Sequence, residues 1–265
     1  MMALCLALAA SCSQKAPKIL VLYYSQTGNT KAVAEQLQSR LGADIEAIVP
    51  VVPYDGDFQA TIERSMADRE AGTLPEIQPL ASDLSAYDVI FLGYPVWFGT
   101  YAPPVASLLK AADLSGKKLV PFCTFGSGGL DSSARDLEAE VPGAEILPGY
   151  GVRAARMDAV PSELDYFLKA NGFIEGEYDP LPEFPESHAV SEEESAIFSA
   201  AVGDYPMLHA TAAEVAPRPV PGGMEYLFTA LDAPREGAPE AEPRSIRIYV
   251  LALDGQAPVF TQVLR

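Results

Sequence analysis

Residues 18–37 read KILVLYYSQTGNTKAVAEQL, and they place a strand directly before a helix. The run at 19–24 is continuously apolar and rich in β-forming residues, which is typical of a strand buried on both faces of a parallel sheet. Apolar residues then recur every four positions from Val33 to Leu41, which predicts a helix. Between the two lies a short turn, residues 25–30, that is rich in hydroxyl and amide side chains.

The same alternation of strand and helix continues to residue 172. Further strands are predicted at 45–49, 89–92, 119–123 and 146–147. Further helices are predicted at 58–70, 103–109, 132–140 and 161–172. Five such alternations predict an α/β fold with a doubly wound, five-stranded parallel sheet.

The turn at 25–30 has the composition of a phosphate site. A phosphate placed there would meet free backbone N–H groups and the positive end of a helix dipole, and Gly28 would let the backbone approach closely. The candidate ligands are Ser25, Gln26, Thr27, Gly28, Asn29 and Thr30. The spacings of the Walker loop and of the dinucleotide fingerprint are both absent. Ordinary helix capping is the alternative interpretation.

Two later turns strengthen the phosphate interpretation. One carries aromatic side chains at a strand end, where they are costly unless something flat covers them; its candidates are Tyr94, Pro95, Val96, Trp97, Phe98 and Gly99. The other can offer backbone donors to a flat polar ring; its candidates are Thr124, Phe125, Gly126, Ser127 and Gly128. The alternatives are core packing for the aromatic residues and a flexible turn for the glycines.

Topology would bring the three turns together. In the doubly wound order 2-1-3-4-5, strands 1, 3 and 4 are neighbours, and their carboxyl ends meet at the switch point where ligands bind. The three turns would then form one crevice, with a phosphate cradle at one end and aromatic walls at the other. Flavin mononucleotide (FMN) fits that description.

Three segments, KILVLYYSQTGNTKAVAEQL, FLGYPVWFGTYAPPVASLL and PFCTFGSGG, together resemble the flavodoxin family, especially its shorter bacterial branch. The resemblance covers roughly residues 17–173. It implies FMN as the cofactor, with its phosphate at 25–30, its ring stacked on Trp97 and its other side closed by the turn at 124–128. Many electron-carrier flavodoxins have a tyrosine in that last turn, where Phe125 is the only aromatic residue here.

Composition narrows the classes of partner. The chain has 265 residues, a net charge of −18 and 49% hydrophobic residues, so it can form a core while its surface repels nucleic acids and anionic lipids. Its three cysteines and two isolated histidines show no metal-ligand spacing, and we expect no metal site.

The first 15 residues resemble an export signal. They are apolar and rich in small residues, and they are too short to span a bilayer as a helix. Residues 8–12 resemble a lipoprotein signal in which Cys12 carries the lipid. We therefore expect an exported, envelope-located protein that meets the membrane only through a lipid anchor. An ordinary frayed terminus is the alternative.

The domain organisation predicted from these patterns is a leader at 1–15, a flavodoxin-like domain at 16–174, an acidic proline-rich linker at 175–190 and a small α+β domain at 191–265. The last domain would consist of a helix opened by a capping box and an antiparallel sheet. Its segment 217–226 faintly resembles a cystatin-like loop that leads into a strand, although the inhibitory QxVxG pattern is missing.

The leading functional hypothesis is an FMN-dependent redox protein, either an electron carrier or an oxidoreductase, that serves a redox partner protein or a small-molecule electron acceptor. The flavin would supply the chemistry, so no catalytic side chain is expected. One alternative is an NAD(P)H-dependent quinone or azo reductase on the same fold. Another is a non-enzymatic envelope binding protein with a degenerate flavin site.

Overall fold

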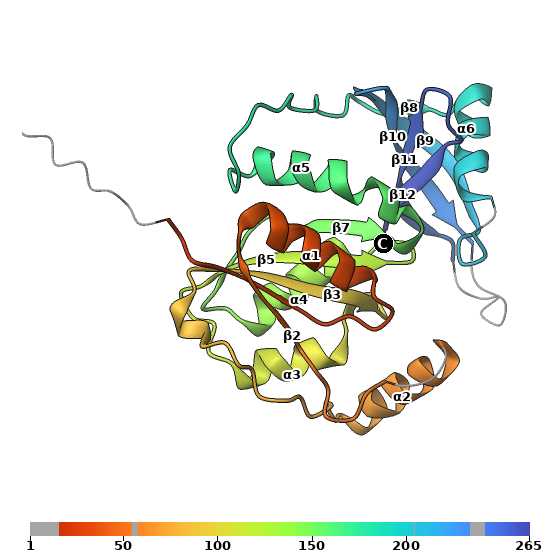
Figure 1. Ribbon diagram of the computed structural model, residues 1–265. Coiled ribbons are helices and arrows are strands. Elements are labelled where there is room, and N and C mark those ends of the chain that lie inside the picture. The colour runs from red at the N-terminus through yellow and green to blue at the C-terminus, as the bar shows by residue number, and fades with distance from the viewer. Residues whose placement is uncertain (1–15, 55–57, 204, 234–241) are drawn as a thin grey trace, which may run out of the picture.

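The computed structural model describes residues 16–54, 58–203, 205–233 and 242–265, and it consists of an α/β unit followed by a smaller antiparallel unit (Figure 1). The strands of the first unit are β1 (Ile19–Tyr23), β2 (Asp44–Ala47), β3 (Val89–Trp97), β4 (Thr100–Tyr101), β5 (Lys118–Phe125), β6 (Glu145–Ile146) and β7 (Tyr150–Arg153). Its helices are α1 (Asn29–Leu41), α2 (Phe58–Ala71), α3 (Pro103–Ala111), α4 (Leu130–Glu140) and α5 (Val160–Ala170), with 3₁₀ turns at Leu84–Ala86 and Ala154–Ala159.

The first sheet has the predicted doubly wound topology. Its order is β2-β1-β3-β5-β6, all parallel, with β7 also parallel to β5 and β4 turned back against β3. The fifth position in the sheet, next to β5, is therefore shared by the two short strands β6 and β7, of which the sequence pattern predicted only β6. Pro148 and Gly149 separate them, and a side chain on Gly149 would collide with the carbonyl oxygen of Pro121.

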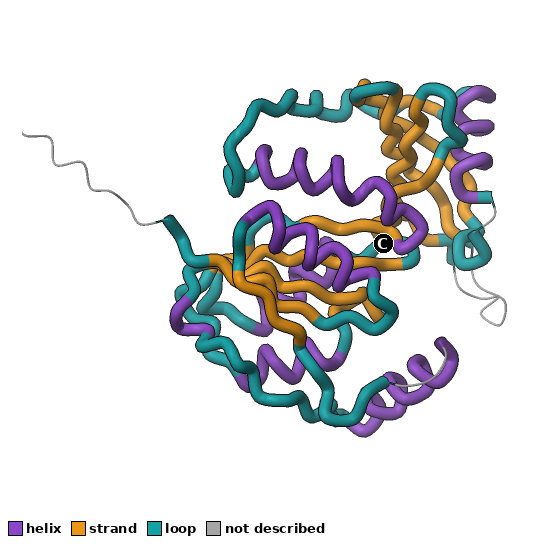
Figure 2. The backbone as a smooth tube through the Cα atoms, in the orientation of Figure 1, coloured by secondary structure: helices purple, strands orange, loops and turns teal. Residues whose placement is uncertain are grey.

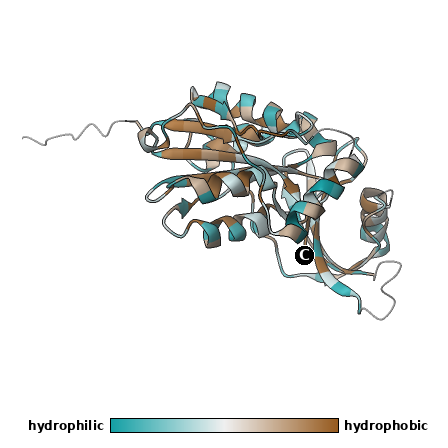
Figure 3. Cartoon of the chain, turned by 90° about the horizontal axis from the view of Figure 1, so that it is seen from below, coloured by the Kyte–Doolittle hydropathy of each residue, from teal (hydrophilic) through white to brown (hydrophobic). Residues whose placement is uncertain are grey.

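Helices cover both faces of this sheet (Figure 1). Helices α1 and α5 bury Leu37 and Leu164 against one face, and α3 and α4 bury Leu108 and Leu137 against the other. The strands between them are almost uniformly apolar, as Figure 3 shows. That double burial explains why their sequences are continuous hydrophobic runs rather than alternating ones.

The predicted aromatic turn at 94–99 is a hairpin in the structure. Strand β3 extends as far as Trp97, and the chain reverses at Phe98 and Gly99 so that Thr100 pairs with Trp97. Both turn residues have positive φ, 52° for Phe98 and 84° for Gly99. This conformation matches the primed turns that join the two strands of a hairpin through a two-residue loop.

The second unit contains α6 (Glu192–Val202) and the strands β8 (His188–Ala189), β9 (Ala210–Val220), β10 (Gly223–Asp232), β11 (Arg244–Leu253) and β12 (Val259–Leu264). These strands form one antiparallel sheet in the order β12-β11-β10-β9-β8. The predicted capping box is present, because Ser191 and Glu194 cap each other's backbone N–H groups. Phe198 and Val202 of α6 join the core on one face of the sheet.

The segment 217–226, which faintly resembles a cystatin-like loop leading into a strand, lies mostly in the paired strands β9 and β10. Pro217 lies opposite Tyr226 and Pro219 opposite Met224, with the reversal at Pro221 and Gly222. Strand β8 covers β9 only at Glu214 and Val215, so the prolines lie on an open edge. Proline is tolerated there because its missing N–H faces no neighbouring strand.

The acidic segment that follows α5 crosses to the second sheet as an extended strap (Figure 2). Phe184 of the strap contacts the ring of Tyr249 at 5.7 Å, and the Arg218 guanidinium lies 4.1 Å from the centre of the Phe184 ring. Arg218 also donates to the Pro182 carbonyl and pairs with Glu225. The strap is thus bound to side chains of β9 and β11 in the second unit.

The predicted leader, including Cys12, lies outside the described residues. Of the helices in the described parts of the chain, none has the length and apolar character that crossing a bilayer requires.

Candidate functional site

Three loops meet at the carboxyl edge of the parallel sheet, and we call them the first (24–30), second (94–101) and third (124–129) loops. The first and second loops touch through aromatic rings, with Tyr24 and Trp97 at 5.9 Å in an edge-to-face arrangement. The Tyr24 backbone N–H also donates to the Gly93 carbonyl at 2.9 Å. Loops that lie about seventy residues apart in sequence are therefore held side by side.

The third loop touches both of the others. The hydroxyls of Thr30 and Thr124 share a buried hydrogen bond of 2.9 Å, which joins the start of α1 to the end of β5. Just beyond the third loop, Ser132 donates to the Gly99 carbonyl at 2.5 Å. The convergence predicted from the strand order is therefore present in the structure.

The first loop keeps its backbone donors available. Within the described residues, the N–H groups of residues 26–30 donate to no protein acceptor, and Gly28 provides no side-chain cap for α1. A side chain on Gly28, whose φ is 93°, would enter open space. The hydroxyl oxygen of Ser25 accepts the Lys31 N–H at 3.1 Å, which leaves the Ser25 O–H free to donate outward.

This loop therefore fits a phosphate without a basic side chain. Free amides at a helix start carry about half a positive charge and point at an incoming anion. Lys31 points along the helix, where its ammonium lies 3.7 Å from Glu35. Thr27 is exposed and Asn29 half-buried, whereas Thr30 is buried and its hydroxyl shares a hydrogen bond with Thr124.

An aromatic cluster borders the first and second loops. Trp97 is half-buried and lies 5.2 Å from the ring of Tyr54, which is 6.5 Å from Tyr24. Gln26 ties the cluster together, since it accepts the Tyr24 hydroxyl at 2.6 Å and donates to the Tyr54 carbonyl. Burial raises the pKa of Tyr24 and raises that of Tyr54 to about 12, so both rings stay neutral at physiological pH.

Sequence reasoning missed Tyr54. It lies between the strand predicted at 45–49 and the helix predicted at 58–70, in a segment to which no role in the site was assigned. A tyrosine between a proline and an Asp-Gly pair is an ordinary turn pattern, so the local signal was weak.

The predicted aromatic site residues of the second and third loops differ in their exposure. Tyr94 and Phe125 are buried in the core, Tyr94 with its hydroxyl 3.0 Å from Ser133, so their rings are covered by protein. Phe98 is 50% exposed although its φ is positive, an uncommon conformation for a bulky residue that tends to occur at functional sites. In the second loop the buried hydroxyl of Thr100 has no hydrogen-bond partner among the described residues, and it is a further donor that the sequence did not single out.

The third loop is also held from outside the first unit. The Ser127 carbonyl accepts the Val263 N–H of β12 at 2.7 Å, and a side chain on Gly128 would lie only 2.2 Å from the Val263 carbonyl oxygen. Arg153, at the end of β7, donates to the Gly126 carbonyl at 2.8 Å. Sequence reasoning missed Arg153, because β7, the strand that ends at this residue, was itself not predicted.

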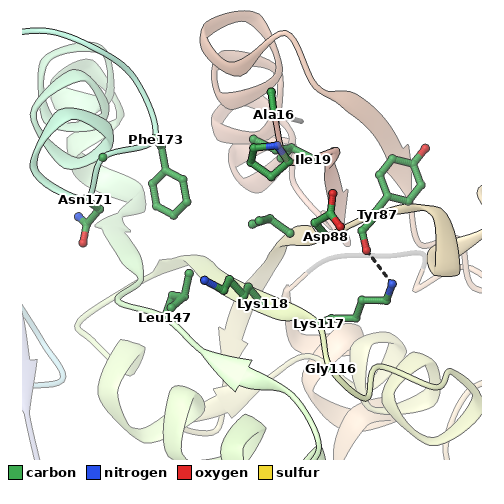
Figure 4. Close-up of a pocket in the computed structure, with 13 residues that line it drawn as sticks. Ala16, Ile19, Tyr87, Asp88, Gly116, Lys117, Lys118, Leu147, Asn171 and Phe173 are labelled. Atoms are coloured by element: carbon green, nitrogen blue, oxygen red, sulfur yellow. Dashed lines mark hydrogen bonds between the residues drawn. The ribbon is translucent and has the colours of Figure 1, made fainter. Parts of the chain in front are cut away.

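A cavity of about 880 Å³ lies at the opposite edge of the sheet (Figure 4). Its lining includes Ile19, Val89 and Lys118, which begin strands β1, β3 and β5. Ligands of doubly wound folds bind at the carboxyl ends of the strands, so this cavity is not the predicted site. In the described ranges, no group of three histidine, cysteine or acidic residues could hold a metal ion.

The comparisons with known proteins agree with this geometry. The family model described as Flavodoxin matches residues 18–160. A curated relative from Gluconacetobacter diazotrophicus, named NAD(P)H dehydrogenase (quinone), is 34% identical over 93 residues, which are 34% of this chain and 44% of that relative. The chain thus matches less than half of that relative's length.

Two solved structures are similar to the first unit. One from Bacteroides uniformis has 24% identity and a TM-score of 0.51 and covers 57% of this chain and 99% of its own, which supports the fold alone. A flavoprotein from Lactobacillus acidophilus in complex with FMN has 27% identity and a TM-score of 0.48 over 57% of this chain and 97% of its own. The family match and the loop geometry support FMN as the cofactor of this site.

We predict that Thr30→Val destabilises the chain by about 1–3 kcal/mol, because it leaves the buried Thr124 hydroxyl without its partner. The double variant Thr30→Val/Thr124→Val should recover most of that loss, since both polar groups are then removed. Urea unfolding measures both effects, with Thr27→Val as the control at an exposed hydroxyl. A Thr30→Val protein as stable as the wild type would contradict this link between the loops.

Proposed function

Because the chain belongs to the flavodoxin family, we propose that it is an FMN-dependent redox protein that binds its flavin across the three loops at the carboxyl edge of the sheet. The observation that carries this proposal is the convergence of unpaired helix-start amides, a half-buried tryptophan and a donor-rich turn at one edge. Bound FMN would supply the electron-transfer chemistry, and the chain would bind, orient and shield it.

The residues divide the binding task by chemistry. The amides of residues 26–30, with the hydroxyls of Ser25 and Thr27, would hold the phosphate dianion at the positive end of α1. Trp97 would stack on the flavin ring, with Tyr54 and Tyr24 holding it from behind. The third loop would supply backbone donors to the polar edge of the ring.

We predict that the purified full chain binds FMN and quenches its fluorescence. Thr27→Ala should weaken FMN binding by about tenfold and leave riboflavin binding unchanged, because a hydrogen bond to a charged group contributes about 1.5–3 kcal/mol and riboflavin lacks the phosphate. Trp97→Ala should weaken both ligands alike. Lys31→Met is the matched control, since that side chain pairs with Glu35. A chain that fails to bind FMN would overturn the proposal.

The first candidate function within this redox role is that of an electron carrier. The net charge of −18 favours a basic partner protein, and association between opposite charges is fast at low salt and slows as salt screens it. No side chain need act as an acid or base in such a protein.

A quinone reductase is the second candidate, and the similarity to the Gluconacetobacter diazotrophicus relative favours it. In that reaction NAD(P)H gives up a hydride, and the quinone gains two electrons and two protons, one of them from solvent. The products are NAD(P)⁺ and the hydroquinone. The half-exposed Phe98 would border the entry of such a flat acceptor.

Steady-state kinetics separates the two candidates. We predict that the FMN-loaded carrier oxidises NAD(P)H with a quinone no faster than free FMN does, and that it accepts electrons from a reductase at a rate that falls steeply with salt. Sustained NAD(P)H oxidation that saturates with quinone and resists salt would instead establish the reductase. Phe98→Ala would then raise the KM for the quinone.

We also propose that the chain is exported and carries a lipid on Cys12, which lies in a leader-like stretch. Radiolabelled palmitate should label the wild-type protein expressed in a bacterium, and Cys12→Ala should abolish the label and release the protein from the membrane fraction. The internal Cys123, which is buried, gives the control variant Cys123→Ala. Equal labelling of wild type and Cys12→Ala would refute the anchor.

A further inference from the structure

The second unit is attached to the third loop through one buried cation. Arg153 is only 9% exposed, and its Nε donates to the Gly126 carbonyl at 2.8 Å while its Nη1 donates to the Phe260 carbonyl at 2.9 Å. Its guanidinium also lies 3.4 Å from the centre of the Phe260 ring and 5.4 Å from that of Tyr205. Arg153 therefore bridges the loop and the second unit.

Arg153 is an expensive residue to bury. Burial lowers its pKa, and among the described side chains no carboxylate forms an ion pair with it. Its charge is instead stabilised by two carbonyl dipoles and two aromatic faces, all of which come from the third loop or the second unit. A planar guanidinium can make these contacts at once, whereas a lysine ammonium cannot.

Strand β12 adds a second attachment one residue along the loop. The Val263 N–H donates to the Ser127 carbonyl at 2.7 Å, and Arg265 donates to the Ser127 hydroxyl at 3.3 Å. The contact is close because Gly128 has no side chain; a Cβ there would lie 2.2 Å from the Val263 carbonyl oxygen. This glycine is thus explained by the approach of β12.

These two attachments fix the direction of two amides. In a planar trans peptide the N–H points opposite to the C=O, and all described peptide bonds are trans. The Gly126 carbonyl faces Arg153, so the Ser127 N–H points away from Arg153. The Ser127 carbonyl faces β12, so the Gly128 N–H points away from β12. In the described structure neither amide donates to a protein acceptor.

We propose that the second unit is a working part of the flavin site, in which Arg153 and β12 act as positioning elements that aim the Ser127 and Gly128 amides at the polar edge of the flavin ring. This inference rests on the proposed function. A loop of three glycines within four residues would otherwise lose much conformational entropy on binding, and the attachments remove that loss in advance.

The test compares FMN with riboflavin for the full chain. Arg153→Met should raise the dissociation constants of both ligands by about tenfold and by the same factor, because it loosens a loop that contacts the ring. Thr27→Ala, at the phosphate loop, should affect FMN alone. Arg153→Lys should fall close to Arg153→Met, since its ammonium cannot reach both carbonyls.

Strand β12 offers a matched pair of variants. Val263→Pro removes the N–H that binds Ser127 together with part of the side chain, whereas Val263→Ala removes only side-chain bulk. Val263→Pro should weaken both flavins by about tenfold, and Val263→Ala by less than threefold. Hydrogen exchange of the Val263 amide, measured without flavin, should rise at least about tenfold in Arg153→Met, while the amides of β1 remain protected and show that the fold is intact.

The outcomes separate the two proposals. Unchanged flavin affinities in Arg153→Met and Val263→Pro, with normal binding by the wild type, would overturn the positioning role and leave the FMN site standing. Tighter binding in these variants would also overturn it, because the second unit would then obstruct the flavin. A wild-type chain that binds neither flavin would instead overturn the proposed function, whatever the exchange of Val263 shows.

Discussion

Parallel pairing in the order β1-β3-β5 forces three loops, distant in the chain, onto one edge of the sheet. Parallel strands need crossover connections, and the helices of those connections occupy both faces of the sheet. The chain therefore leaves β1, β3 and β5 at the same edge of the sheet. The pairing of the strands brings the loops together, and the Thr30–Thr124 hydrogen bond and the Tyr24–Trp97 contact then hold them in place.

The proposed site would let a strongly acidic chain hold an anion. With a net charge of −18, long-range electrostatics opposes phosphate binding, so attraction must come from groups close to the ligand. Backbone amides at the start of α1 would meet that need because they cost no side-chain entropy and bring no mobile charge. The ammonium of Lys31, the nearest cation in sequence, lies 3.7 Å from Glu35.

Two glycines of the third loop, Gly126 and Gly128, contribute to the contact with the second unit. Gly128 makes room for the backbone of β12, and Gly126 presents its carbonyl to Arg153, so both serve the contact between the units as well as any ligand. Burying an arginine is costly, and in the described structure this cost is offset by hydrogen bonds to the Gly126 and Phe260 carbonyls and by the ring of Phe260. The loop that closes the site is therefore shaped from two sides.

Hydrophobic runs, a hydroxyl-rich turn before a helix and the spacing of later turns were enough to predict a doubly wound parallel sheet and the three loops from the sequence, because burial on both faces and helix capping are local properties of a chain. The order of the strands came from the resemblance to the flavodoxin family. The sequence did not reveal β7, the β9 strand with its prolines, Tyr54 or the Arg153 bridge. Each of these depends on a partner far along the chain: β5 for β7, an open sheet edge for Pro217, Trp97 for Tyr54 and Phe260 for Arg153. Only the tertiary structure decides such contacts, because their free energy comes from groups that no local pattern brings together.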